Sequence, residues 1–237
     1  MAHDPLWMQM FLAIHIAAGV GTFLLAPVAL ATAKGGKQHR RWGMVYLWCM
    51  GIVAGTAIPM ALFRPVLFLA LVAVFSFYFA FSGYRILKLK ELANGGSAQP
   101  IDWIAGSVTF LTSALLAWLG WFRPDIMRMP RIVPVLFGLI GMRLAYAELK
   151  KFVRKPKQKM FWWYTHLGNF IGSYIVAWSA FSVVTLARVF GNTWYVWLWP
   201  TIVGVPAIIL TVGYYERKFA HHPVVVQQAD LPHLSHP

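Results

Sequence analysis

Apolar residues in this chain gather into seven long runs, which short polar segments separate. The runs cover residues 6–31, 42–63, 65–87, 101–122, 131–149, 161–187 and 194–215. A helix rises 1.5 Å per residue, so about 20 apolar residues cross the ~30 Å hydrocarbon core of a bilayer. The pattern therefore predicts an all-α, polytopic membrane protein with seven transmembrane helices.

The seven runs predict one transmembrane domain over residues 1–219, and the segment 220–237 has a different composition. It is rich in His, Pro and Gln, and segments of low hydrophobicity cannot bury enough apolar surface to fold. We expect a disordered cytoplasmic tail there. The first run ends in Ala31-Thr32-Ala33, which resembles a signal-peptide cleavage site. No basic segment precedes it and the run is too long, so we expect a retained helix.

Charged residues are scarce and mostly basic. They make up 12% of the chain, whereas a soluble domain has about 25%. A net charge of +14 is as high as in many nucleic-acid-binding proteins. The placement of the charges indicates another role, because most basic residues follow the first, third, fifth and seventh runs. Because cytoplasmic loops carry the excess of Lys and Arg, this predicts an outside N-terminus and a cytoplasmic C-terminus. We expect attraction to the bilayer and its anionic lipid headgroups, and no nucleic-acid partner.

Two histidines lie inside apolar runs, where an ionisable residue is a candidate functional residue because it is costly to bury. His15 lies about 12 Å below the outer boundary marked by Trp7, and His166 about 6 Å above the inner boundary marked by Trp162. The two imidazoles therefore differ by about 12 Å in depth within a ~30 Å core. His39, at the inner mouth of the second run, is the better partner for His166.

Further polar residues reach the same inner level as His39 and His166. They are Arg85, Asp102, Arg143, Glu148 and Asn169. Imidazoles ligate haem iron or a divalent metal, with carboxylates or amides in support. Guanidinium groups match haem propionates, phosphates or carboxylates. We therefore expect a cofactor or substrate site on the cytoplasmic half, with His166 and His39 as candidate metal ligands and His15 as a further candidate.

Three functions remain open from the residues alone. The first is a redox protein associated with haem or another metal. The second is a small-solute or proton-coupled transporter, since His15 and His166 lie on runs of opposite direction and each precedes a Gly by six residues. The third is a structural or assembly subunit, in a homo-oligomer or a membrane complex, whose histidines hold helices together and whose Arg85, Asp102 and Glu148 reach towards the headgroups.

A family resemblance covers the first, second and sixth runs. Pro27-x-Ala29-Leu30, Lys34-Gly35 and His39-Arg40-x-x-Gly43-x-x-Tyr46 resemble the opening motif of a group of uncharacterised bacterial inner-membrane proteins, and 166–181 resembles a later motif of that group. The resemblance implies a multi-pass protein of the bacterial cytoplasmic membrane and brings no activity with it. It also implies that His15, His39 and His166 belong to the family pattern.

Overall fold

The computed structural model describes residues 4–63, 67–127, 129–158 and 160–221, which form helices and no strands. Seven of these helices are long and apolar enough to cross a membrane: α1 (Leu6–Ala31), α2 (Lys37–Phe63), α3 (Leu67–Arg85), α4 (Pro100–Phe122), α6 (Ile132–Val153), α7 (Phe161–Phe190) and α8 (Trp194–His221). The shorter ones are η1 (Ile86–Lys88), η2 (Lys90–Asn94) and α5 (Pro124–Met127). The all-α fold with seven candidate spans is confirmed.

Several helix ends lie beyond the apolar runs that predicted them. α2 begins at Lys37, after a turn in which Gly35 has a φ of 78°, because Lys, Gln and Arg favour helix although they are polar. His39 therefore lies in the first turn of α2. α6 and α8 continue to Val153 and His221 in the same way. Of the expected disordered tail at 220–237, Ala220 and His221 belong instead to α8, and 222–237 lies outside the described residues.

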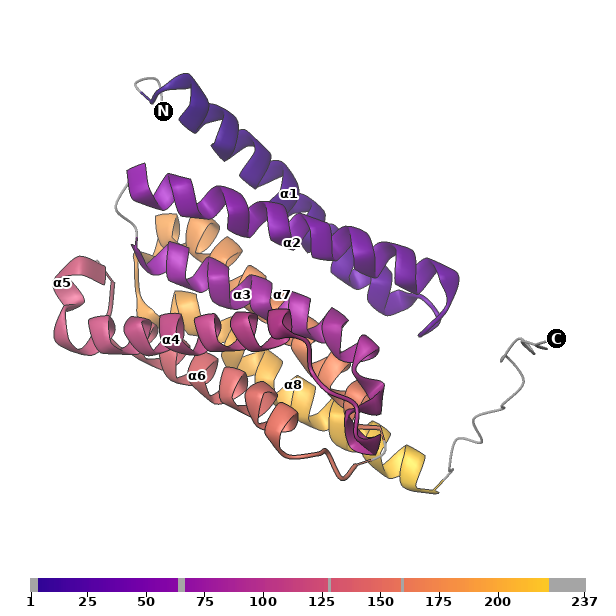
Figure 1. The fold of residues 1–237 in the computed structure, drawn as a ribbon. Coiled ribbons are helices and arrows are strands. Elements are labelled where there is room, and N and C mark those ends of the chain that lie inside the picture. Colours follow the sequence, from indigo (N-terminus) through magenta and orange to yellow (C-terminus); the bar gives the residue numbers. More distant parts are fainter. Residues whose placement is uncertain (1–3, 64–66, 128, 159, 222–237) are drawn as a thin grey trace.

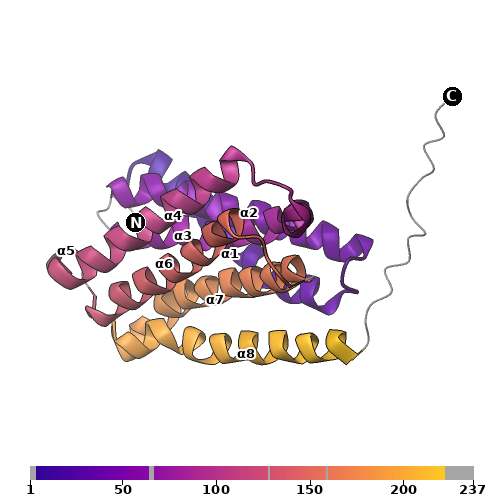
Figure 2. The same ribbon diagram turned by 60° about the horizontal axis from the view of Figure 1, so that its bottom comes forward.

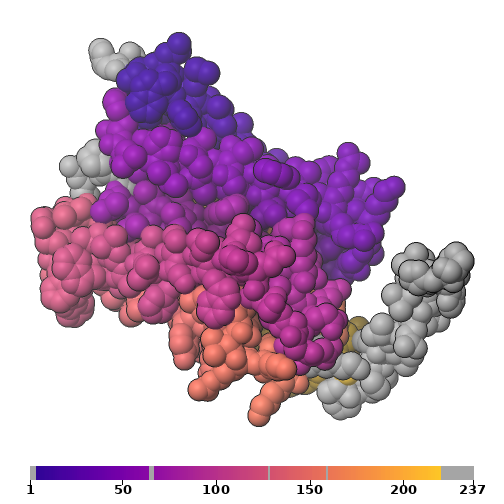
Figure 3. Space-filling model, viewed as in Figure 1, coloured from indigo at the N-terminus to yellow at the C-terminus, as the bar shows by residue number. Residues whose placement is uncertain are grey.

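The chain passes back and forth along one axis, and consecutive long helices run in opposite directions (Figure 1). α1 packs on α2, α4 on α6, and α7 on α8, while α3 contacts α2, α4 and α7. α3 is accordingly the most buried of the seven. Turned by 60°, the ribbon shows α8 along one edge with α7 between it and the other helices (Figure 2). The space-filling view shows the indigo-to-purple α1–α2 hairpin as an upper layer resting on the remaining bundle (Figure 3).

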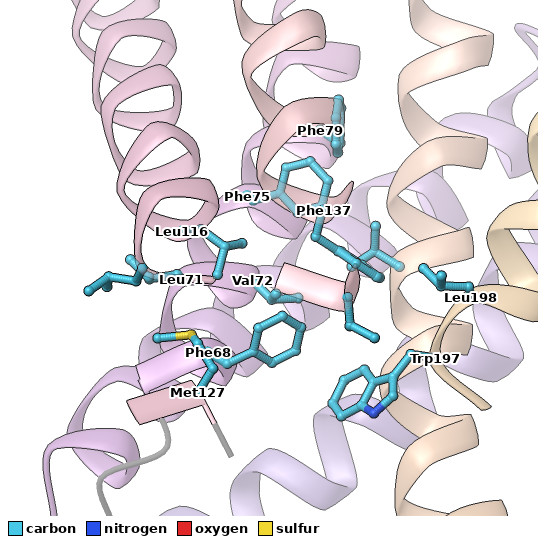
Figure 4. Packing of buried hydrophobic residues seen from close by; sticks show 13 residues of the cluster. Phe68, Leu71, Val72, Phe75, Phe79, Leu116, Met127, Phe137, Trp197 and Leu198 are labelled. Carbon is cyan, nitrogen blue, oxygen red and sulfur yellow. The ribbon is translucent and has the colours of Figure 1, made fainter. Parts of the chain in front are cut away.

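The largest apolar core forms around α3. Phe68, Phe75 and Phe79 of α3 meet Phe137 of α6 and Trp197 of α8 in a cluster of buried aromatic rings (Figure 4). The Phe68 and Trp197 rings meet edge to face with centroids 4.9 Å apart. Outside this core many large apolar side chains are exposed, as expected for helices whose outer surface faces lipid.

One end of the bundle carries most of the basic residues, and we call it the basic end. It lies at the right of Figure 1 and comprises the C-terminal ends of α1, α3, α6 and α8 with the N-terminal ends of α2, α4 and α7. The candidate site residues His39, His166, Arg85 and Glu148 belong to these helix ends. Because each side chain sits on a different helix, contacts between them depend on packing at this end.

Candidate two-histidine site

His39 and His166 lie side by side at the basic end. The first comes from the first turn of α2 and the second from the second turn of α7. Their ring centroids are 6.1 Å apart and their planes cross at 74°. Both side chains are half-buried. The structure thus brings together the two histidines that the depth comparison paired.

Backbone carbonyls orient both imidazole rings. His39 Nδ1 lies 2.9 Å from the Ala29 carbonyl oxygen, and His166 Nδ1 lies 2.8 Å from the Gly83 carbonyl oxygen. A carbonyl oxygen only accepts, so both Nδ1 atoms carry the hydrogen, and in a neutral ring Nε2 then holds the lone pair. Ala29 and Gly83 lie in the last turns of α1 and α3, where carbonyls lack the partner four residues on that a helix interior supplies. The Ala29 oxygen also accepts from the backbone and the hydroxyl of Thr32. Each ring therefore has a donor nitrogen fixed by a helix end and an Nε2 able to ligate a metal.

Close packing of α3 against α7 makes the second of these hydrogen bonds possible. A Cβ at Gly83 would lie 2.7 Å from a ring carbon of Phe170 and 3.2 Å from the Asn169 Cβ. The Phe170 ring in turn lies 4.8 Å from the His166 ring, centroid to centroid. Only glycine at position 83 allows this approach, which brings its carbonyl within reach of His166.

A lysine adds positive charge beside the pair. Lys34, in the turn between α1 and α2, donates from Nζ to the Leu30 carbonyl oxygen. Partial burial lowers the pKa of its ammonium group. Lys34 lies close enough to His166 to interact with it electrostatically. An anionic group bound at the two histidines would meet this charge.

Glu148 is the centre of a second, separate polar cluster. Its side chain is only 6% exposed, and Oε1 accepts from Lys151 Nζ at 2.8 Å and from Asn169 Nδ2 at 3.2 Å. Lys151 also donates to Thr165 Oγ1, and Asn169 to Ser82 Oγ. The cluster connects α3, α6 and α7 one turn away from His166. Its hydrogen bonds join Glu148 to a cation and an amide, and neither histidine belongs to the cluster.

Arg85 and Asp102 fasten the end of α3 to the start of α4. The guanidinium donates to both carboxylate oxygens at 2.7 and 2.8 Å, and also to Gln99 Oε1 at 2.8 Å. Asp102 also accepts from the Gln99 backbone N–H in a capping box. A cavity of about 10 Å³, enough for roughly one water, lies between these groups and the Glu148 cluster. It is lined in part by Tyr78, Ser82, Arg85, Asp102 and Glu148.

His15 belongs to neither cluster. Its Nδ1 lies 2.9 Å from Thr56 Oγ1 on α2, and that hydroxyl donates to the Ile52 carbonyl oxygen. His15 is therefore the donor in a bond that joins α1 to α2. Thr56 lies about 25 Å along α2 from His39, so the structure separates His15 from the other two histidines.

Arg143 lies away from the cluster with which we expected it. It is exposed on α6, whereas Gly141, Ala145 and Glu148 on the other side of the helix are buried. The expectation considered depth alone. Position 143 is about 200° around the helix from position 141, given 3.6 residues per turn. Arg143 therefore faces outward, although its depth along α6 is close to the inner level at which we expected it.

Sequence reasoning missed several residues of both clusters. The Ala29 and Gly83 carbonyls have no sequence signature, because every residue carries one. Lys151 did carry a signal, since it follows Glu148 at the i,i+3 spacing of a helical ion pair. Thr165 precedes Asn169 by four residues and therefore shares its helix face.

Within the described residues no group of three or more His, Cys, Asp or Glu side chains could hold a metal ion. A metal at His39 and His166 would thus have two protein side-chain ligands. Comparisons with protein-family models, with curated proteins and with solved structures gave no match.

Proposed function

We propose that His39 and His166 are a ligand pair for a metal-containing cofactor, and that haem iron fits them best. The observation that carries this is the geometry of the two rings. Two metal–nitrogen bonds of ~2 Å and the two ring radii place imidazole centroids about 6 Å apart on opposite sides of one ion. The centroids here are 6.1 Å apart.

Ligand number favours haem over a divalent ion held by protein alone. Structural zinc takes four protein ligands and catalytic zinc three, and no such group occurs among the described residues. Haem iron needs protein ligands only at its two axial positions. The charge of Lys34 acts on His166 and would attract an anionic edge of the cofactor. Filling both axial positions with imidazole would suit electron transfer, and this supports a redox role.

The test is the spectrum and metal content of the purified full chain, before and after titration with haem. We expect a Soret band that is lost in both His39→Ala and His166→Ala. His15→Ala is the matched control, because it removes a transmembrane imidazole that bonds to Thr56 and lies far from the pair, and it should keep the band. A folded preparation that is colourless, metal-free and unable to bind haem would contradict the proposal and favour a structural or assembly subunit.

Proton-coupled transport of a small solute is the second candidate, and the buried Glu148 cluster favours it. A carboxylate that is 6% exposed and bonded to an amide and a lysine is the type of group that relays protons in membranes. Proteoliposomes with an internal pH dye would report solute-driven proton flux. If the protein is such a transporter, Glu148→Gln should abolish this flux and His15→Ala should retain it. Equal flux in both variants would contradict the transport function.

The membrane and orientation are part of the proposal. The basic end carries Lys and Arg residues at the ends of α2, α3, α6 and α8, in η1 and η2, and in the turn at Lys34, and cytoplasmic loops have this excess. We propose that this end faces the cytoplasm in a bacterial inner membrane. The two histidines would then lie in the cytoplasmic half, and exposed lysines near them would contact anionic lipid headgroups.

A further inference from the structure

Arg143 is a charged residue about halfway along α6, on the outside of the bundle. It lies about 15 Å from both ends of α6, at 1.5 Å per residue. The side chain is exposed, and it forms no hydrogen bond or ion pair with the residues that the structure describes. Arginine within a transmembrane segment nearly always faces a bundle interior or pairs with another group. Its position on the lipid side therefore requires a partner.

Lipid headgroups are the weaker candidate for that partner. The apolar run of α6 ends at Leu149, and Lys150 lies about 10 Å along the helix from Arg143. The Cα–Cβ bond of a helical residue also leans towards the helix N-terminus. Reaching the nearer, C-terminal end would oppose that direction, which favours a partner at the depth of Arg143 itself.

The residues around Arg143 form a continuous seam along α6. Exposed Ile132, Leu139, Tyr146 and Val153 follow one another at intervals of seven. Arg143 and Lys150 lie between them at the alternating spacing of four and three that lets one helix pack along another. α6 has α4 on its opposite side and only small contacts with α3 and α8. A polar residue within such a seam selects the partner and its register.

We infer that this seam binds a transmembrane helix of another protein that carries a carboxylate at the depth of Arg143. A second copy does not fit, because a two-fold pairing along α6 would place Arg143 against Arg143. The carboxylates of this chain within its spans lie near the basic end and have partners: Asp102 binds Arg85, Glu148 binds Lys151, and Glu216 accepts from Gln158. The inference is independent of the proposed haem site.

The test uses a leucine–alanine transmembrane peptide with one central Glu, and the same peptide with Gln. Energy transfer between the labelled full chain and each labelled peptide is measured in phosphatidylcholine vesicles. We expect the wild-type chain to bind the Glu peptide roughly tenfold more tightly than the Gln peptide. Arg143→Leu should remove this preference and Arg143→Lys should keep it. Arg143→Glu paired with a central-Lys peptide should restore it, which guards against a misfolded variant.

Three results would overturn the inference. The first is equal binding of the Glu and Gln peptides by the wild-type chain. The second is energy transfer between two labelled copies of the chain that disappears in Arg143→Leu, which would assign the seam to self-association. The third is loss of the Glu preference when phosphatidylglycerol is added, which would make a lipid headgroup the ligand.

Discussion

At the scale of single residues, Gly83 serves two helices at once. Its missing side chain admits the Phe170 ring, and its carbonyl oxygen accepts from His166. The residue therefore connects packing with the orientation of an imidazole. A substitution at this position acts on both, although Gly83 itself has no chemistry to contribute to a cofactor.

Gly83→Ala is expected to destabilise the protein by about 1–3 kcal/mol, because the new Cβ overpacks the α3–α7 contact. Thermal unfolding in detergent measures the change. Gly172→Ala on α7 is the matched control, since its Cβ would meet nothing within 4 Å, and it should be neutral or slightly stabilising. Equal unfolding temperatures for the two variants would contradict the packing at Gly83.

The exposed pair Arg123–Asp125 gives a prediction about pH. The hydrogen bond from Arg123 lowers the pKa of the Asp125 carboxyl. A lowered pKa contributes stability at neutral pH that is lost as pH falls through that pKa. Because both side chains are more than half exposed, solvent screens the contribution. In Arg123→Gln, a nuclear magnetic resonance titration should find the Asp125 pKa raised towards its ordinary value. An unchanged pKa would exclude the pair in solution.

At the scale of elements, the joint between α3 and α4 depends on one buried ion pair. Asp102 is 2% exposed in its side chain and Arg85 13%. The carboxylate also completes the cap of α4. Losing it leaves a largely buried guanidinium without its counter-charge at the place where two spans and η1 meet.

Asp102→Asn should therefore destabilise the protein by on the order of 3 kcal/mol, measured by thermal unfolding in detergent. Asp125→Asn removes the same carboxylate charge from an exposed pair and is the matched control, with no measurable change expected. Equal losses of stability in Asp125→Asn and Asp102→Asn would show that burial does not explain the contribution of the Arg85–Asp102 pair.

Elements were easier to predict than the contacts between them. The seven helices follow from apolar runs that match the thickness of a bilayer. The start of α2 was missed because Lys37 to Arg41 are polar yet favour helix, and hydropathy registers only polarity. Depth along a helix placed His39 beside His166 but misplaced Arg143, because depth carries no information about which way a side chain faces. The carbonyls of Ala29 and Gly83 were beyond sequence reasoning, since backbone acceptors look alike at every position.

At the scale of the whole molecule, the asymmetry of charge between the two ends gives a testable orientation. Ser97, after η2, is exposed at the basic end, and Asp125 is exposed at the opposite end. In a Cys49→Ala background, Asp125→Cys should react with a membrane-impermeant maleimide in intact cells. Ser97→Cys should react only after permeabilisation. The reverse pattern would place the basic end outside and contradict the proposed cytoplasmic half-site.

The two imidazoles come from the second and the sixth of the seven spans. During synthesis His39 enters the bilayer early, and its neighbour arrives only when α7 has been translated and inserted. A ribosome that stalls after α6 therefore leaves a membrane-embedded chain with no paired histidines. The hydrogen bond from His166 to Gly83 must likewise wait for α7. Any cofactor loading at the pair is thus a late step of biogenesis, and it reports that nearly the whole bundle has assembled.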